Sequence, residues 1–525
     1  MRSLTPYVFI ASLFIIFSCT PPENYDLLIK NGEVFNAETG EFTVMDLAIN
    51  GDEIVKMGKS LSATGTKTID ATGLVVSAGF IDMHAHIEGI MRIPTAESAL
   101  RQGVTTALGG PDGGGPSPMG KYLDTLRNFD LGINTAYLVG HNTIRRRVMR
   151  TENREPTAEE LEAMKGRVRE AMEAGAFGIS TGLKYVPGSF SKLDEVIELS
   201  KVAAEGGGIY TSHLREEGLG LIEAVQEAIV IGREADIPIV LTHHKAIGKP
   251  MWGASVKTLA MIDSARNIGL DIMADQYPYT ASSTGIAVLI PTWARAGGSA
   301  AFKARIDDPA TRKKIIEEIM FNIEFDRGGA DLNVVQFAFV NWQPDLNGKT
   351  LKDWAIERGL EPTFRNGAEL VVEAQLKGGA TCIFHAIGEE DVKRIMQHPQ
   401  VMVASDGRLA EIGVGHPHPR AYGTFPRVLG HYVRDEGVLP LQTALQKMTS
   451  IPADRLGLKD RGYLKAGYKA DITIFDKNTV DEKGTFEAPH AYPVGIEYVI
   501  INGGVTIDAG ELTRQRSGRV IRKTD

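Results

Sequence analysis

The sequence predicts an α/β protein centred on a TIM-like (β/α)8 barrel, and three observations lead to this class. Short apolar runs suited to buried strands alternate with amphipathic helical segments through most of the chain. Eight such runs can be counted, which is the number that closes a parallel barrel. Histidine and aspartate residues stand at the carboxyl ends of several runs, where a barrel of this kind gathers its functional side chains.

The predicted barrel strands are short and mostly apolar. They lie at 79–86, 104–109, 135–140, 177–185, 209–214, 238–243, 271–277 and 401–406. Apolar residues recur at helical spacing between several of them, which predicts helices at 158–174, 194–205 and 221–234. An insertion at about 286–377 interrupts the last repeats, and its helical run at 312–323 indicates a subdomain over the barrel mouth.

The sequence pattern at both ends of the chain differs from that of the predicted barrel. Short alternating runs within 25–69 are separated by Asn-Gly pairs, which are hairpin signals. Similar runs return at 470–505. We therefore predict one small β-sandwich domain built from residues 19–72 and 455–525, with the barrel domain at 73–454.

Composition and charge exclude one class of partner. The chain has 525 residues, 43% of them hydrophobic, which is ordinary for a globular protein. Its formal net charge of -9 argues against nucleic acid as the main partner, because a phosphate-binding surface needs clustered Lys and Arg. We expect a small-molecule substrate instead.

The first 18 residues resemble a bacterial lipoprotein signal peptide. Arg2 precedes an apolar run at 7–17 that is too short to span a bilayer comfortably, and Ser18 stands before Cys19. We therefore expect a lipid anchor at Cys19 and a place in the bacterial cell envelope, on the periplasmic or outer-surface side. An ordinary secretory signal or a short anchor is the alternative. The other cysteine is Cys382, so acylation of Cys19 leaves no intramolecular disulfide.

Polar residues at four strand ends indicate a metal site. His84 and His86 are two apart, so both side chains project from one face of the first strand and can reach one ion. His213 ends the fifth strand, His243 the sixth and Asp406 the eighth. Unrelated structural histidines have no reason to fall at the same end of successive strands, so the grouping is more specific than a single pair.

The sixth strand ends in three polar residues, and alternation selects one of them as a ligand. The side chains of His243 and Lys245 project from one face of the strand, and His244 projects from the other. We choose His243 as the metal ligand and expect His244 to pack or to orient its neighbours.

Amide hydrolysis explains why a carboxylate joins these histidines. A bound divalent ion polarises the scissile carbonyl and lowers the pKa of a bound water from about 15.7 to about 7. A nearby carboxylate must then take the proton of the water and pass it to the departing amine. Asp406 is the candidate for this general base and acid role; its alternative is a turn residue before Gly407.

With these features in place, the sequence resembles the N-acyl-D-amino-acid deacylases, or D-aminoacylases, of the amidohydrolase superfamily over nearly the whole mature chain. The segments that carry the resemblance are GVTT at 103–106, VGHN at 139–142, GISTGLKYVPG at 178–188, TSHLREE at 211–217, HHK at 243–245, DQYPY at 275–279 and HPRAYGTFPR at 418–427. The resemblance implies zinc-dependent removal of an acyl group from an N-acyl-D-amino acid. It also implies that His213 and His243 hold the tighter metal, that His84 and His86 hold a second, weaker position, and that Asp406 is the catalytic carboxylate.

One departure from the family pattern leaves two interpretations open. The family has a cysteine metal ligand after the second strand, and this chain has Asp112 there. Asp112 replaces the thiolate with a hard oxygen ligand in one interpretation, which moves the preference from zinc alone towards harder divalent ions. In the other, Lys184 is carboxylated on its amine and bridges two metals, as in dihydroorotase-like and hydantoinase-like relatives. We favour Lys184.

Substrate contacts are predicted from the need to hold a carboxylate. Cationic and phenolic donors suit this task, and Tyr185, Lys245, Tyr279 and Arg420 lie in segments expected at the barrel mouth. The leading function is therefore deacylation of N-acyl-D-amino acids with one or two divalent ions. Because the family cysteine is missing and Lys184 is present, a cyclic amidase of the dihydroorotase or hydantoinase type, or a dipeptidase, remains the alternative function. A non-catalytic envelope binding protein is the remote alternative.

Overall fold

The computed structural model describes residues 23–327, 329 and 331–524. The predicted signal peptide and Cys19 lie outside these residues. Among the helices that are described, none has the length and apolarity needed to cross a membrane.

A ring of eight parallel strand positions forms the centre of the molecule. They are β6 (Phe80–Asp82) with β7 (Ala85–His86), β8 (Val104–Gly109), β9 (Asn134–Tyr137) with β10 (Val139–Gly140), β11 (Gly178–Gly182), β12 (Ile209–His213), β13 (Ile239–Leu241), β14 (Ile272–Gln276), and β18 (Val401–Val403) with β19 (Gly407–Arg408). Neighbours pair in parallel from β6 to β9 and from β10 to β18. β19 pairs with β7, so the last position returns to the first. The predicted barrel is therefore confirmed, although several strands end earlier than predicted.

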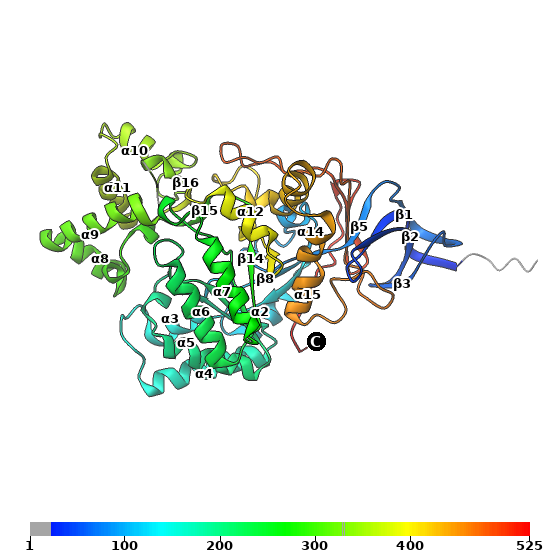
Figure 1. Cartoon of the computed structure of the whole chain (residues 1–525), viewed down its shortest axis with the longest axis horizontal. Coiled ribbons are helices and arrows are strands. Elements are labelled where there is room, and N and C mark those ends of the chain that lie inside the picture. Colours follow the sequence, from blue (N-terminus) through cyan, green and yellow to red (C-terminus); the bar gives the residue numbers. More distant parts are fainter. Residues whose placement is uncertain (1–22, 328, 330, 525) are drawn as a thin grey trace, which may run out of the picture.

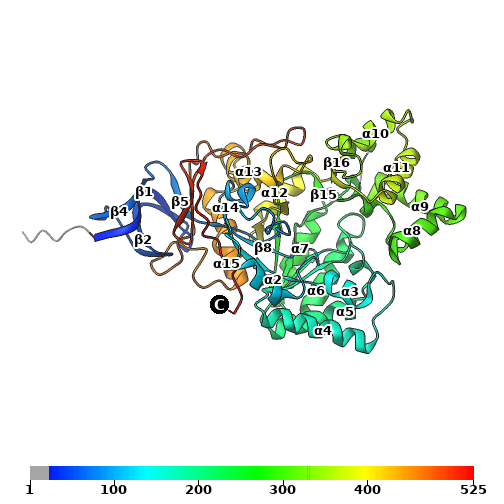
Figure 2. The ribbon, with the colours of Figure 1, turned by 180° about the vertical axis from the view of Figure 1, so that it is seen from behind.

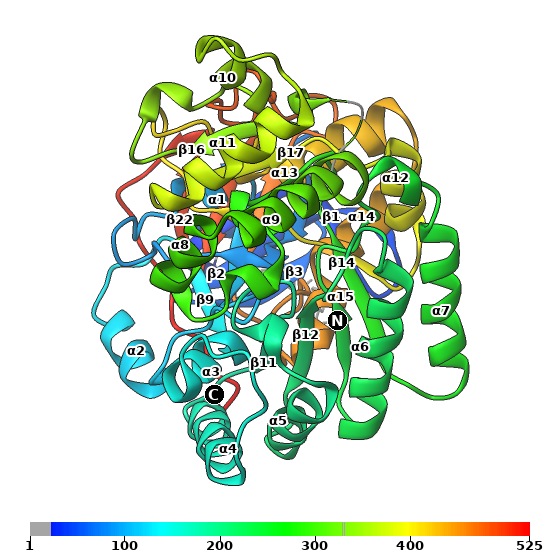
Figure 3. The same cartoon turned by 90° about the vertical axis from the view of Figure 1, so that its left-hand side faces the viewer.

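Helices cover the outside of this barrel (Figure 3). They are α1 (Glu97–Leu100), α2 (Met119–Leu126), α3 (His141–Met149), α4 (Ala158–Glu173), α5 (Leu193–Glu205), α6 (Leu221–Ala235), α7 (Ser255–Asn267), α12 (Glu389–Gln397), α13 (Arg420–Arg427), α14 (Leu441–Met448) and α15 (Ser450–Leu456). Their apolar stripes are buried against the strands, for example at Val168 and Ile231. Thr157 and Glu160 form a reciprocal capping box that starts α4.

The interior of the barrel is filled by side chains. Leu108, Ile209, Val240, Met273 and Met402 come from different strands and belong to one buried cluster. The barrel is therefore a packed core rather than a pore, and its functional groups can gather only at the strand ends.

Both ends of the chain join one β domain. Its nine-stranded sheet contains β1 (Glu23–Asn36), β2 (Glu41–Asn50), β3 (Glu53–Gly58), β4 (Ala63–Asp70), β5 (Val75–Ala78), β20 (Ile472–Phe475), β21 (Ile496–Ile501), β22 (Gly504–Asp508) and β23 (Glu511–Leu512). The two ends meet where β20 pairs antiparallel with β5. Leu47 and Ile472, one from each end, share a buried cluster. Eight of the strands follow one hydrogen-bonded path from β23 to β3, and β4 branches from it by pairing with β1, which refines the predicted sandwich.

The two Asn-Gly pairs near the N-terminal end play different parts. Asn50-Gly51 forms the predicted hairpin turn between β2 and β3. Asn31 has a φ of 59° and lies inside β1, where the pairing with β2 shifts register. This second pair therefore forms a bulge and not a turn.

The insertion forms a subdomain at the opposite end of the molecule from the β domain (Figures 1 and 2). Its elements are β15 (Ser282–Gly285), α8 (Gly298–Asp307), α9 (Pro309–Phe321), β16 (Val335–Phe339), α10 (Leu351–Glu357), α11 (Phe364–Leu376) and β17 (Thr381–Phe384). Ile316, Trp354 and Val371 belong to a core of its own. Figure 3 shows its helices in front of the barrel strands. The sequence limits given above for the domains stay predictions.

Candidate metal centre

Six predicted side chains gather at the carboxyl ends of the barrel strands. They are His84 and His86 at the first strand position, Asp112 after β8, His213 at the end of β12, His243 after β13 and Asp406 after β18. The four histidines and two aspartates are buried or nearly buried. The barrel therefore brings together residues that are more than 300 positions apart in the sequence.

Asp112 lies between two groups of potential ligands. His84, His86 and Asp406 lie on one side of it, and His213 and His243 lie on the other. Its Oδ1 is 3.5 Å from the Nε2 of His84 and 3.4 Å from the Nε2 of His243. Its Oδ2 is 3.6 Å from the Nε2 of His86 and 3.7 Å from the Nδ1 of His213. Asp112 is the residue that both groups share.

The donor atoms fit a divalent cation. In a tetrahedral zinc site with bonds of about 2.1 Å, neighbouring ligand atoms lie about 3.4 Å apart, which is close to the distances around Asp112. Within the described chain, the Nε2 of His84 and the Oδ1 of Asp112 are buried without a hydrogen-bond partner. The Nδ1 of His213 and the Nε2 of His243 face each other at 2.8 Å. Because buried polar atoms are normally paired, this arrangement points to a cation.

Three of these residues have a strained backbone. The φ angles of Asp112, His243 and Asp406 are 54°, 38° and 48°, in a region that residues other than glycine rarely adopt. The loop that carries Asp112 is held by Ser180, whose Oγ accepts a hydrogen bond from the Gly113 N–H at 3.1 Å. Strain of this kind is concentrated at functional sites, and here it occurs at three potential ligands.

The surroundings set the charge of each ligand. Burial lowers the pKa of His84 to about 3, so its imidazole is neutral and can offer a lone pair. Burial and Lys245 lower the pKa of His243, but the neighbouring carboxylates outweigh them and raise it to about 9. Burial raises the pKa of Asp406, but the Arg420 guanidinium and the imidazoles outweigh it and hold this pKa well below its usual range. The carboxylate of Asp406 is therefore ionised at neutral pH.

Comparison with known proteins identifies the family. A sequence model of the amidohydrolase family matches residues 67–507. The chain belongs to the amidohydrolase family. It is 35% identical to the D-aminoacylase of Alcaligenes xylosoxydans xylosoxydans, over 95% of this chain and 98% of that relative. It is also 35% identical to the N-acyl-D-glutamate deacylase of the same organism, over 95% of this chain and 97% of that relative.

Solved structures of the same two kinds of enzyme are similar to this chain. A crystal structure of D-aminoacylase has a TM-score of 0.81 and 33% identity, and covers 95% of this amidohydrolase and 100% of that chain. An N-acyl-D-glutamate deacylase from Bordetella bronchiseptica, complexed with zinc and a phosphonate inhibitor, has a TM-score of 0.81 and 32% identity with the same coverage. A D-hydantoinase at 15% identity and a TM-score of 0.56 shares the fold alone.

Lys184 does not lie among the ligands of this amidohydrolase. Its Nζ is 2.8 and 2.6 Å from the two carboxylate oxygens of Glu216 and 3.6 Å from the Oδ2 of Asp326. β11 already ends at Gly182, so strand alternation does not extend to Lys184, whose side chain lines a separate cavity. The structure thus gives no support to the predicted carboxylated bridge, and Asp112 occupies the shared position instead.

Three of the four predicted substrate contacts line the cavities of the site: Tyr185, Lys245 and Arg420. The Tyr185 hydroxyl is 3.4 Å from the Nδ1 of His213 and accepts a hydrogen bond from Thr284 at 3.0 Å. The guanidinium of Arg420 pairs with Asp406 at 2.8 Å. These two side chains therefore face the potential ligands directly.

Tyr279 lies apart from the site. Its hydroxyl donates a hydrogen bond to Glu482 at 2.7 Å, and the Arg427 guanidinium lies over its ring. It lines neither cavity at the metal centre. The prediction of Tyr279 as a direct substrate contact is not supported by this placement, because Glu482 and Arg427 engage its hydroxyl and ring outside both cavities.

Glu217 is a buried member of the site that the sequence pattern did not reveal. Its carboxylate is 3.2 Å from the Nδ1 of His243 and 3.4 Å from the Nε2 of His213, which are the nitrogens opposite to those facing Asp112. It also forms an ion pair with Lys245, whose Nζ lies 2.8 Å from the Nδ1 of His243 and 2.7 Å from its carbonyl oxygen. These contacts engage the ammonium of Lys245 within the protein. The one feature of the sequence that could have indicated Glu217 is its position four residues after His213.

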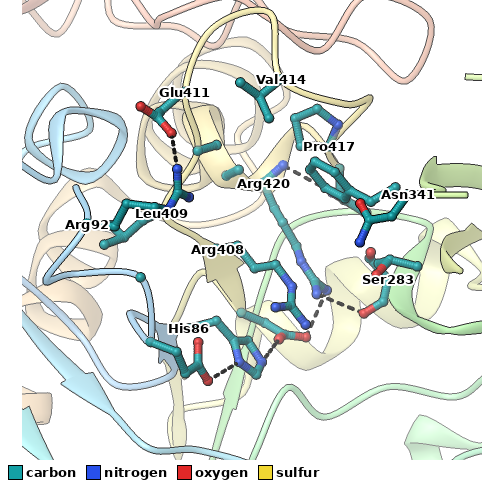
Figure 4. A pocket seen from close by; sticks show the side chains of 18 residues that line it. His86, Arg92, Ser283, Asn341, Arg408, Leu409, Glu411, Val414, Pro417 and Arg420 are labelled. Carbon is teal, nitrogen blue, oxygen red and sulfur yellow. Dashed lines mark hydrogen bonds and ion pairs between the residues drawn. The ribbon is translucent and has the colours of Figure 1, made fainter. Parts of the chain in front are cut away.

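Two cavities open at the metal centre. The smaller, of about 260 Å³, contains the Asp112, Glu217 and Lys245 side chains together with Arg327 from the insertion. Arg327 is buried, and its Nη1 lies 3.4 Å from Glu217. The larger, of about 340 Å³, begins at His86 and extends between the barrel and the insertion (Figure 4). The insertion therefore supplies part of the wall of both cavities.

Proposed function

We propose that this amidohydrolase hydrolyses N-acyl-D-amino acids to a carboxylic acid and a free D-amino acid. The observation that carries the proposal is the position of Asp112 between two groups of histidines, at the strand ends of a chain 35% identical to a D-aminoacylase. Zinc is the proposed ion, and it is present in the related N-acyl-D-glutamate deacylase structure. The oxygen ligand Asp112 also suits harder divalent ions.

The metal and the protein divide the chemistry. His213, His243 and Asp112 would hold one ion, and His84 and His86 with Asp112 would hold a second. A bound divalent ion polarises the scissile carbonyl and lowers the pKa of a water molecule. The remaining steps are proton transfer and orientation, which belong to side chains of this chain.

Asp406 is the proposed carrier of the proton. Because its carboxylate is ionised at neutral pH, it can accept the proton of the attacking water. Its Oδ2 is held 2.8 Å from the Nη1 of Arg420, and its Oδ1 lies 3.2 Å from the Nε2 of His86. Asp406 then gives the proton to the departing nitrogen, so that the amine leaves in neutral form. Tyr185 and Arg420 are the proposed contacts for the carboxylate of the substrate.

Kinetics of Asp406→Asn test this function. Zinc-loaded wild type is expected to hydrolyse N-acetyl-D-methionine faster than the L enantiomer, a dipeptide or dihydroorotate. Asp406→Asn is expected to lower kcat by about 10² to 10⁴-fold, since a general base is removed, and to retain the metal held by His213 and His243. Asp435→Asn, which removes a surface carboxylate, is the control. Wild-type turnover in Asp406→Asn overturns the catalytic assignment, and faster hydrolysis of dihydroorotate overturns the linear substrate.

We further propose that Cys19 carries a lipid anchor in the bacterial cell envelope. The support is the sequence itself, in which Ser18 and Cys19 follow a short apolar run. Cys19→Ala is expected to move the protein from the membrane fraction to the soluble fraction. Retention of this variant in the membrane fraction contradicts the anchor.

A further inference from the structure

The larger cavity offers room for a substrate group beyond the scissile amide. It begins at His86 and Asp406 and ends at a rim that contains Arg92 (Figure 4). Apolar side chains, including Leu409 and Val414, form part of its wall. Its volume of about 340 Å³ lies within the range of small-molecule sites. Two portions of an N-acyl amino acid can extend from the amide: the acyl group and the amino-acid side chain.

Three guanidinium groups line this cavity, and two of them are paired. Arg92 forms an ion pair with Glu411 at 2.5 Å. Arg420 is 2.8 Å from Asp406 and donates a hydrogen bond to the Ser283 carbonyl oxygen at 3.2 Å. Arg92 and Arg420 therefore each have an ion-pair partner in the protein.

Arg408 is the third guanidinium, and it differs from the other two. Among the residues that the structure describes, no carboxylate oxygen lies within 4.0 Å of it. Glu88 is the acid near it, but the Glu88 carboxylate is bonded to the Nδ1 of His86 at 3.0 Å. Arg408 lines both cavities, and its side chain extends into the larger one (Figure 4). Arg408 is exposed at the cavity, and an arginine there without an ion-pair partner can bind a carboxylate, because its planar donors match both oxygens.

The backbone holds Arg408 at a defined place relative to the metal centre. Arg408 belongs to β19 and pairs in parallel register with His86 of β7. It also follows Asp406 by two positions, so both side chains come from the same short segment. A binding group carried by a paired strand is better placed than one on a free loop.

We propose that Arg408 binds a second carboxylate of the substrate, remote from the scissile amide, and thereby selects dianionic N-acyl-D-amino acids. This inference rests on the proposed function. The second carboxylate has two possible sources, the acyl group, as in an N-succinyl amino acid, or the amino-acid side chain, as in an N-acyl-D-glutamate. The relatives described above include both a D-aminoacylase and an N-acyl-D-glutamate deacylase, so family membership alone leaves this choice open.

Matched pairs of substrates test the proposal. One pair is N-acetyl-D-glutamate and N-acetyl-D-glutamine; the other is N-succinyl-D-alanine and its neutral N-succinamoyl analogue. The quantity to compare is the ratio of kcat/KM, acidic over neutral, for zinc-loaded wild type, Arg408→Gln and Arg92→Gln. We expect at least one pair to favour the acid in wild type, and Arg408→Gln to lower that ratio about tenfold or more. Arg92→Gln removes a paired guanidinium from the same cavity and is expected to change the ratio less than threefold.

The outcomes show which part of the substrate carries the second carboxylate. They also distinguish failure of the role of Arg408 from failure of the proposed function. The pair that responds identifies whether the acyl group or the side chain carries the second carboxylate. No preference for either acid in wild type, an unchanged ratio in Arg408→Gln, or an equal loss in Arg92→Gln overturns the role of Arg408. If wild type hydrolyses none of the four compounds, the proposed function has failed. Arg408 is then judged by calorimetric binding of glutarate to the zinc-loaded proteins: a tenfold weaker Kd in Arg408→Gln supports it, and an equal Kd overturns it.

Discussion

Glu217→Gln is the substitution that most directly tests how the metal centre is held. The carboxylate of Glu217 faces the Nδ1 of His243 and the Nε2 of His213, so it can hold both imidazoles with their other nitrogens toward Asp112. A partner of this kind sets the tautomer and the ring orientation of a metal ligand. Glutamine keeps the shape and one acceptor oxygen of Glu217 but removes the charge.

The expected magnitude follows from the contact distances. Loss of a partner that orients metal-ligating histidines usually weakens metal binding about 10 to 100-fold, or about 1.4 to 2.7 kcal/mol. The two contacts of Glu217 with the imidazoles, at 3.2 and 3.4 Å, are longer than strong charge-assisted bonds of about 2.8 Å. We therefore expect a loss near tenfold. The variant is also expected to have a lower Tm, because the buried ammonium of Lys245 loses its ionised partner.

Competition with a fluorescent zinc chelator measures this affinity on folded protein, and elemental analysis gives the metal content. Glu216→Gln is the matched control, because Glu216 is the adjacent residue and contacts Lys184 outside the ligand groups. It is expected to bind zinc within twofold of wild type. Zinc affinity of Glu217→Gln within twofold of wild type, or equal weakening in Glu216→Gln, refutes the positioning role of Glu217.

Three further predictions follow from other parts of the structure. Asp112→Ala is expected to lose one bound metal and to weaken the other, because both histidine groups share this carboxylate; two full equivalents by elemental analysis contradict the bridge. Lys184→Met is expected to keep the wild-type metal content, and a loss of metal restores the carboxylated lysine as a candidate. Burial lowers the pKa of Lys447 to about 7 in the folded chain, so the unfolded chain binds more protons between pH 7 and 10.5 and stability rises with pH across that interval. Lys447→Met is therefore expected to show a shallower rise of the urea midpoint from pH 7 to 9, and equal slopes contradict it.

The sequence predicts the barrel and most of the ligand cluster because both depend on local patterns. Apolar runs place the strands, and the carboxyl ends of parallel strands must lie at one end of a barrel. His84, His213 and Asp406 could therefore be grouped before any distance was known. The assignment of His243 over His244 also agrees with the geometry: His243 faces Asp112, whereas His244 bonds to Thr258 at 2.8 Å on the other side.

Sequence patterns do not place a side chain that lies beyond the end of a strand. They also do not show contacts between segments that are far apart in the sequence. The predicted strand at 177–185 included Lys184, but β11 ends two residues before it, so strand periodicity does not fix the direction of that side chain. Glu217 lies beyond the end of β12, in a segment without a regular period. Arg327 reaches the site from the insertion, and no local pattern could show that the insertion packs against this barrel end.

Charge pairing gives an independent reason to regard Asp112 as the residue that needs a cation. Among the ionised carboxylates of the site, Glu217 pairs with Lys245, and Asp406 pairs with Arg420. Asp112 has only imidazoles within ion-pair distance in the described part of the chain. In the described chain the buried Asp82 and Asp275 also have no Lys or Arg side chain within ion-pair distance, but burial raises their pKa values to about 6 and about 7, so both take up a proton far more readily than Asp112 does. For Asp112 the surrounding imidazoles outweigh burial and hold its pKa well below the usual range, so a proton does not neutralise it at neutral pH. In the metal-free chain the His243 imidazolium, whose pKa is raised to about 9, balances this charge; a divalent ion bound between the two histidine groups would displace that proton and take its place.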